Sequence, residues 1–202
     1  MPKLVDHEER RGEIIEAVWS LISSRGFAAV TMRDLAAEAG YANGALARYF
    51  PDKESVLRAA FRRAFDATNE RATAAIGDRG GLAALRLLAL EIMPTDDVKL
   101  REARVVIGFW DYAVGEPDLA AYYASTTTEW RDQVRLYLRQ ARATGDIPVG
   151  RPDELVIDSL LAMLMGLQIT ALFMPGDTTP ERQYAMLDDF IAGLRRGTGD
   201  GA

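Results

Sequence analysis

Apolar residues recur at intervals of three and four along almost the whole chain, and no segment shows the strict alternation of a half-buried strand. This spacing predicts an all-α fold. Clusters of Gly and Pro separate the helical segments, because these residues end or interrupt helices. The expected helices span residues 7–24, 32–39, 43–50, 52–76, 82–93, 97–114, 117–144, 153–174 and 180–196.

The most sharply punctuated stretch is residues 26–54. Thr31 is an N-cap residue, and Asp34 stands three residues later, in the place of the acid of a capping box. Gly40 follows the short helix at the position where a left-handed residue closes it. A second short helix opens at residues 43–45, with Leu46, Tyr49 and Phe50 facing inward. Two short helices joined by a tight turn are the form that lays its second helix into a DNA major groove.

This stretch resembles the amino-terminal domain of the TetR family of transcriptional regulators. The matching residues are Arg25-Gly26-Phe27, Thr31, Leu35-Ala36, Ala39-Gly40, Gly44, Leu46, Arg48-Tyr49-Phe50 and Lys53-Glu54. The resemblance implies a three-helix helix-turn-helix DNA-binding domain at residues 1–51 and a six-helix ligand-binding and dimerisation domain at residues 52–202. Two positions depart from the family pattern. Ala47 replaces a Tyr that commonly reaches a phosphate, and Ala42 replaces a small polar cap, which Asn43 could supply by a one-residue shift.

The candidate DNA-binding residues are polar or small and lie on the expected outer face of this motif. Thr31, Arg33, Tyr49 and Lys53 are placed to hold backbone phosphates, which fix register without reading sequence. Arg48 either reads a guanine edge or takes a phosphate. Tyr41 and Asn43 are expected near the bases, and the small Gly44 and Ala45 let the helix approach the groove. The alternative is an ordinary three-helix bundle that binds nothing.

Composition limits the other functions. The net charge is −6, but residues 1–63 carry ten Lys and Arg against nine Asp and Glu, so the acid is concentrated in the rest of the chain. DNA affinity would then depend on a few placed cations, with a moderate salt dependence. The chain has no Cys and only one His, His7, so no cofactor, metal site or histidine-based catalytic triad is expected. We therefore predict that the protein is not an enzyme. We also expect it to be cytoplasmic, because residues 1–13 lack the apolar segment of a secretory signal.

The expected helix at 153–174 is apolar on nearly all sides, and Asp158 and Ser159 make it too short for a membrane span. A helix of this kind must be covered all round. We predict a homodimer in which it pairs with the helix at 180–196, and the alternative is a central core helix of a monomer. The candidate interface residues are Leu160, Met163, Gly166, Leu167, Thr170, Leu187, Phe190 and Ile191.

The carboxy-terminal part resembles the BetI-like ligand-binding domains of the same family. The matching segments are Phe109-Trp110, Pro117-Asp118-Leu119-Ala120, Trp130-Arg131 and Gly166-Leu167. The candidate ligand-binding residues are Phe109, Trp110, Ala113, Tyr123, Trp130, Met163, Leu167, Gln168 and Phe173. They are aromatic and poor in charge, which favours a mostly apolar or aromatic effector, with Gln168 as an orienting group.

The resemblance implies a repressor that binds a palindromic operator in double-stranded DNA as a homodimer and releases it when a small effector binds. No membrane partner is expected. The alternative is a TetR-like dimeric ligand- or partner-binding module with weak or lost DNA binding, and the departures at Ala42 and Ala47 are its support.

Overall fold

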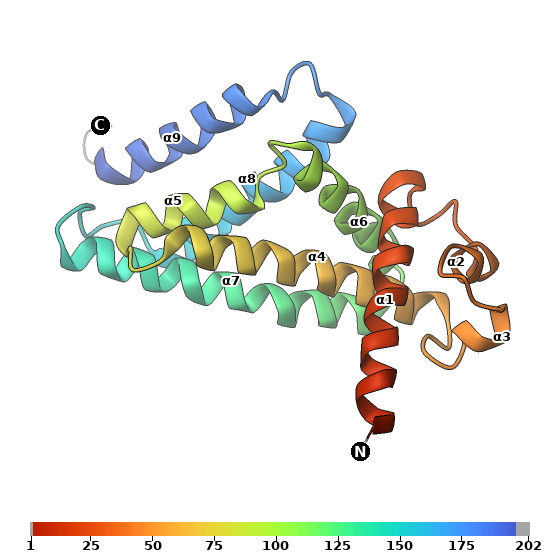
Figure 1. Cartoon of the computed structure of the whole chain (residues 1–202). Coiled ribbons are helices and arrows are strands. Elements are labelled where there is room, and N and C mark those ends of the chain that lie inside the picture. Colours follow the sequence, from red (N-terminus) through yellow and green to blue (C-terminus); the bar gives the residue numbers. More distant parts are fainter. Residues whose placement is uncertain (1, 197–202) are drawn as a thin grey trace. The chain divides into compact units, whose positions relative to one another are not determined.

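The computed structural model describes residues 2–196, and the side chains of residues 2–8 and of Asn43 lie outside that description. Every regular element within it is a helix (Figure 1), as the spacing of apolar residues predicts. The helices are α1 (Pro2–Arg25), α2 (Met32–Glu38), α3 (Asn43–Leu46), α4 (Lys53–Ile76), α5 (Gly81–Ile92), α6 (Asp97–Ala113), α7 (Pro117–Ala143), α8 (Asp153–Phe173) and α9 (Pro180–Arg196). The main differences from the predicted bounds are an earlier start of α1 and a shorter α3.

These helices form two compact units. The first, which we call the amino-terminal unit, comprises residues 1–67 and 101–119, and the carboxy-terminal unit comprises residues 68–100 and 120–202. Most of α6 therefore packs with the helix-turn-helix, although it follows α5 in the chain. The functional boundary between residues 51 and 52 stays a prediction.

The amino-terminal unit is held by apolar side chains from α1 to α4 and from α6. In it, α2 contacts both α1 and α3 (Figure 1). Phe61 of α4 stacks on Phe109 of α6 with ring centroids 4.3 Å apart. Both rings are buried, which ties α6 to the start of α4 through area burial and ring stacking.

In the carboxy-terminal unit, α8 runs through the core and α5 packs against α9 (Figure 1). The buried residues of α8 are Val156, Ile157, Leu160, Leu164, Leu167 and Ala171. By length and composition alone α8 could cross a membrane, and it is the single described helix of which this is true. The core helix of a soluble protein has the same composition, and these six side chains lie in the core of this unit.

An ion-pair network joins α7 to α8 on the surface of the same unit. Arg131 Nη2 lies 2.9 Å from Glu154 Oε2, and Arg131 Nη1 lies 2.7 Å from Asp158 Oδ1. Arg135 Nη2 lies 2.8 Å from Glu154 Oε1. Hydrogen bonds from Arg135 and Arg131 lower the pKa of the Glu154 carboxyl below its ordinary value.

This network predicts an acid-dependent stability. Because the pKa of Glu154 is lowered on folding, its stabilisation is present above pH 4.5, the ordinary value, and is lost as the pH falls through the folded-state pKa. In Glu154→Gln, the urea midpoint should therefore fall less steeply below that pH than in the wild-type protein. The control is Glu70→Gln, which removes a surface charge from α4 and leaves both arginine pairs intact. Equal slopes in wild type and Glu154→Gln would contradict the prediction.

Candidate functional site

The helix α2 begins with a complete capping box. The Asp34 N–H donates to Thr31 Oγ1 at 3.2 Å, and the Thr31 N–H donates to Asp34 Oδ2 at 2.8 Å. The Thr31 hydroxyl itself donates to the same carboxylate at 2.6 Å, which lowers the pKa of Asp34. The predicted cap is confirmed. Since the hydroxyl proton of Thr31 is engaged, this side chain has no proton to donate to a phosphate unless the box opens.

The turn after α2 has the geometry that the sequence predicts. Gly40 adopts a positive φ of 73°, which favours glycine. The Tyr41 N–H donates to the Ala36 carbonyl at 2.8 Å, and the Gly40 N–H donates to the Ala37 carbonyl at 3.1 Å. These two hydrogen bonds form a Schellman motif, which fixes the direction in which the chain leaves α2.

Ala42, and not Asn43, occupies the N-cap position of α3. The Ala42 carbonyl accepts hydrogen bonds from the N–H groups of Ala45 and Leu46, so Asn43 is already the first helical residue. The predicted shift of the cap to Asn43 is therefore wrong, because the backbone hydrogen bonds start one residue earlier. Helical turns continue beyond α3, since the Leu46 carbonyl accepts from the N–H groups of both Tyr49 and Phe50 at 2.9 Å.

The side chains of this segment divide into an inner and an outer face. Leu46 and Phe50 are buried, whereas Gly44 and Arg48 are exposed, together with Arg33 of α2. The rings of Tyr41 and Tyr49 meet edge to face, with centroids 6.0 Å apart, so each limits the movement of the other. Ala45 is half-buried, and Ala47 is exposed where the family pattern has Tyr.

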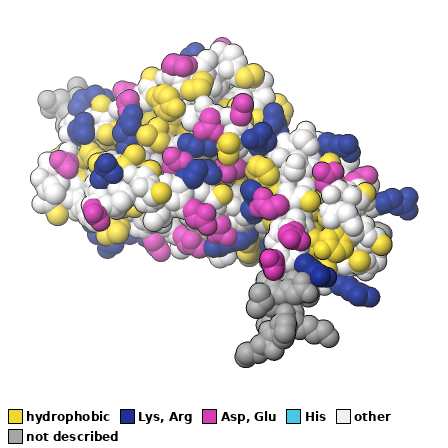
Figure 2. Space-filling view, in the orientation of Figure 1, with side chains coloured by type: hydrophobic (Ala, Val, Ile, Leu, Met, Phe, Trp, Pro, Cys, Tyr) yellow, Lys and Arg dark blue, Asp and Glu magenta, His cyan; other side chains and the backbone are white. Residues whose placement is uncertain are grey.

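Several cations stand on this part of the amino-terminal unit, with acidic side chains among them (Figure 2). Dark blue Lys and Arg side chains stand at the edge that carries α2 and α3 (Figure 2). Arg11 of α1 is one cation that the sequence interpretation missed. Its guanidinium carbon lies 4.9 Å from the centroid of the Phe50 ring. In the sequence, Arg11 stands out only as part of a basic pair with Arg10. Its contact with Phe50 could not be predicted, because that contact depends on how α1 packs.

The structure corrects the predicted dimer interface. Leu160, Leu167, Leu187 and Ile191 are at most 5% exposed in the core of the carboxy-terminal unit, so they offer no surface to a second subunit. The remaining candidates, Met163, Gly166, Thr170 and Phe190, are partly buried. An apolar stripe that does face outward follows α8 with helical spacing. It consists of Ala162, Met165, Ile169 and Phe173 and is called the α8 stripe below.

The predicted ligand-binding residues fall in both compact units. Phe109, Trp110 and Ala113 belong to the amino-terminal unit, and the other six belong to the carboxy-terminal unit. Phe109 is fully buried against Phe61, which gives it a packing role in its own unit. At the end of α8, Phe173 is 73% exposed, so it is wrong as a pocket-lining residue and belongs to the α8 stripe.

Two polar groups in the carboxy-terminal unit have specific hydrogen bonds. Trp130 Nε1 donates to Asn69 Oδ1 at 2.7 Å, which fixes the indole ring. Gln168 Nε2 donates to the Ile92 carbonyl at 2.5 Å. Its Oε1 is buried and has no hydrogen-bond partner among the described residues. A buried, unpaired acceptor is costly, and within the described part of the chain this oxygen is the one atom of Gln168 that still lacks a partner.

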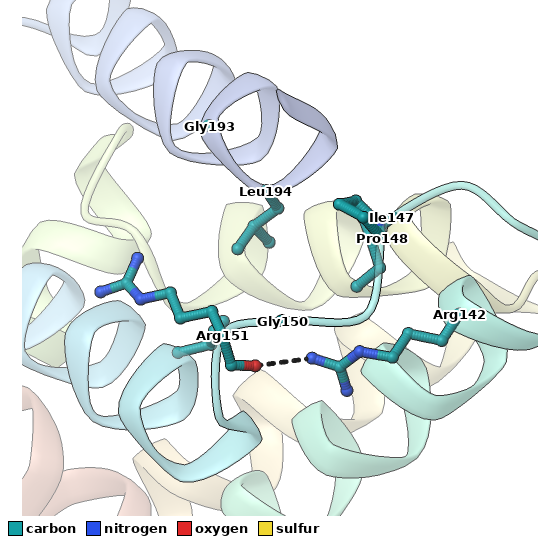
Figure 3. Close-up of a pocket in the computed structure, with 8 residues that line it drawn as sticks. Arg142, Ile147, Pro148, Gly150, Arg151, Gly193 and Leu194 are labelled. Atoms are coloured by element: carbon teal, nitrogen blue, oxygen red, sulfur yellow. Dashed lines mark hydrogen bonds between the residues drawn. The ribbon is translucent and has the colours of Figure 1, made fainter. Parts of the chain in front are cut away.

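A hollow at the amino-terminal end of α8 is too small to hold a small-molecule ligand. It lies under the loop between α7 and α8, where Arg142 donates to the Arg151 carbonyl at 3.0 Å, and Leu194 of α9 closes one side (Figure 3). Its volume is about 50 Å³, and its lining includes none of the predicted ligand-binding residues. Small-molecule sites usually measure hundreds of Å³.

Two family models match this chain. One describes bacterial regulatory proteins of the tetR family and matches residues 14–60. The other describes the carboxy-terminal part of BetI-type transcriptional repressors and matches residues 81–196. The first covers the helix-turn-helix, and the second covers the segment from α5 to α9.

Individual relatives agree with the family models. Over 193 residues the chain is 27% identical to the HTH-type transcriptional regulator BetI of Stenotrophomonas maltophilia, covering 95% of each protein. It is 34% identical to the regulator PksA of Bacillus subtilis, over 59% of this chain and 58% of PksA. A transcriptional regulator from Saccharomonospora viridis, solved in complex with choline, has a TM-score of 0.83 at 26% identity, covering 92% of this chain and 96% of that one. These relatives are regulators and not enzymes.

Proposed function

We propose that this protein, which belongs to the TetR family of bacterial transcriptional regulators, represses transcription from a palindromic operator until a small ligand binds. Its carboxy-terminal part is of the BetI repressor type. The observation that carries the proposal is the capped helix-turn-helix, which buries Leu46 and Phe50 and leaves Arg33, Gly44 and Arg48 exposed. Like its bacterial relatives it would act in the cytoplasm, where the DNA is.

On DNA, the exposed face of α3 would enter the major groove, with Gly44 and Ala45 as the residues of closest approach. Arg48 and Asn43 would lie at the groove, while Arg33, Tyr49 and Lys53 would hold phosphates on either side. The edge-to-face contact with Tyr41 supports this role of Tyr49, because a phenol that is already oriented loses less freedom on binding.

A second copy of the chain would complete the DNA-binding unit. The α8 stripe supports this, because it is an apolar surface that a single chain leaves in water. Pairing of two such stripes about a twofold axis would give a symmetric interface, and a dimer carries two recognition helices that would read two half-sites. The operator would then be roughly palindromic.

The effector would be a small, mostly apolar or aromatic molecule. Tyr123 and Trp130 supply aromatic surface in the carboxy-terminal unit, and the unpaired Gln168 Oε1 supplies an acceptor. A quaternary ammonium alcohol is a second candidate, since the aromatic faces of Tyr123 and Trp130 would bind such a cation. The choline complex of the Saccharomonospora viridis regulator supports this class. Repression is relieved if the ligand binds better to a conformer with the wrong half-site spacing.

One observation favours a second function. Ala47 is exposed where the family has a phosphate-binding Tyr, and Ala42 leaves α3 without a side-chain cap. Both changes would weaken DNA binding, because one removes a phosphate contact and the other a side-chain cap. The alternative is therefore a TetR-like dimeric module that binds a ligand or a partner and has lost most of its affinity for DNA.

Selection of random duplex DNA by the purified protein tests the proposal, with the bound sequences determined at near-physiological salt. A palindromic site with half-sites about one helical turn apart is the expected result. Recovery of no site by a folded, dimeric protein would favour the alternative. In that case Ala47→Tyr, which restores the family's phosphate contact, should recover binding, and Ala37→Tyr on the exposed surface of α2 serves as its control.

A further inference from the structure

Lys53 occupies an unfavourable position for a cation. It is the first residue of α4, where the positive end of the helix dipole disfavours an ammonium group. Its side chain is half-buried, and burial lowers its pKa. Something in its surroundings must therefore compensate the charge.

The compensating group is the ring of Phe27. Lys53 Nζ lies 4.4 Å from the centroid of this ring, within the range of a cation–π contact. Phe27 is only 3% exposed and follows Gly26, whose positive φ of 78° turns the chain away from α1. The ring occupies one side of the ammonium group, which has three N–H donors and keeps others free.

Phe27 is itself held by α6. The ring of Tyr112 meets it edge to face at 5.6 Å, with an interplanar angle of 82°. On the same helix, Gly108 comes so close that a Cβ at this position would lie 3.2 Å from Phe27 Cβ. All of these residues belong to the amino-terminal unit, and Phe27 contacts both the ammonium group of Lys53 and α6.

We infer that Phe27 and Tyr112 are positioning residues, which hold Lys53 in place for a DNA phosphate and make that contact depend on the position of α6. This inference rests on the proposed function. Since Phe27 Cβ lies against α6 at Gly108 and its ring meets Tyr112, a shift of α6 moves the surface on which the ammonium group lies. The phosphate contact of Lys53 would then weaken without any change in the recognition helix.

The test is a double-mutant cycle for binding to a random-sequence duplex at about 50 mM salt, where phosphate contacts supply the affinity. Phe27→Leu keeps an apolar side chain but removes the π face, and should weaken binding about threefold per subunit. Tyr112→Ala should weaken it about twofold. In a Lys53→Ala background both effects should vanish, because these residues act through the ammonium group. Val114→Ala, at an exposed position just after α6, is the control.

Other outcomes separate the inference from the proposed function. If Phe27→Leu and Tyr112→Ala weaken binding equally with and without Lys53, they act by general destabilisation and the inference is wrong. It is equally wrong if Lys53→Ala binds like the wild-type protein, and the proposed function then still stands. If the wild-type protein binds no duplex, the proposed function itself fails. Should Phe27→Leu not fold, Tyr112→Ala at a surface position still decides the question.

Discussion

Ile169→Arg is expected to convert the protein into monomers and to lower its affinity for operator DNA by at least about a hundredfold. Ile169 lies in the middle of the α8 stripe and is 43% exposed in the single chain. In a symmetric dimer the substitution occurs on both subunits, so two unpaired cations would be buried close to the twofold axis. A monomer reaches only one half-site and loses the gain in effective concentration that the second half-site provides.

Sedimentation measures the first effect, since the chain has a mass of 22.2 kDa and a dimer has twice that. The matched control is Leu136→Arg on α7, where a side chain of similar exposure, 44%, lies outside the α8 stripe. This control should remain a dimer with wild-type DNA affinity. A dimeric Ile169→Arg protein would place the subunit contact elsewhere, and the α8 stripe would then need another partner.

Arg48→Ala is expected to weaken operator binding by roughly thirtyfold or more, because each dimer loses two contacts of about 1–3 kcal/mol. The guanidinium is exposed on the outer side of the segment after α3 and packs into no core, so the loss should leave thermal stability unchanged. Titration of operator DNA at several salt concentrations measures both the affinity and its salt dependence.

The salt dependence distinguishes the two roles of Arg48. If it holds a phosphate, the slope of log affinity against log salt should fall by about one for each arginine removed. If it reads a guanine, the slope should stay constant while the preference at one position of each half-site relaxes. Arg139→Ala, which removes an exposed charge from α7 in the carboxy-terminal unit, is the control. Wild-type affinity of Arg48→Ala would remove this residue from the site.

Local patterns were enough for the secondary structure and the family. The Thr31–Asp34 capping box and the left-handed Gly40 are confirmed, because each involves residues at most a few positions apart. The resemblance to the TetR family and to BetI-type regulators is also confirmed, since it depends on residue types at fixed spacing. The cap at Asn43 was wrong, although it is local, because a capping side chain does not decide by itself where the first helical hydrogen bond forms.

The orientation of the helices could not be predicted in the same way. The helix α8 is apolar on nearly all sides, so its periodicity does not show which side faces the core of its own unit. The periodicity predicted Leu160 and Leu167 at the dimer interface, and only the packing shows that they are buried while Met165 and Ile169 are exposed.

The sequence by itself determined the helices found in residues 2–196, the helix-turn-helix, its exposed Arg33 and Arg48, and the family, because these follow from spacing along one segment. The tertiary structure alone decided that α6 packs with the helix-turn-helix, that Phe27 contacts both Lys53 and α6 at Gly108, and that the α8 stripe is exposed in the single chain. The physical reason is that burial and ring contacts depend on side chains brought together from distant parts of the chain. The spacing of these residues in the sequence does not predict which of them will meet.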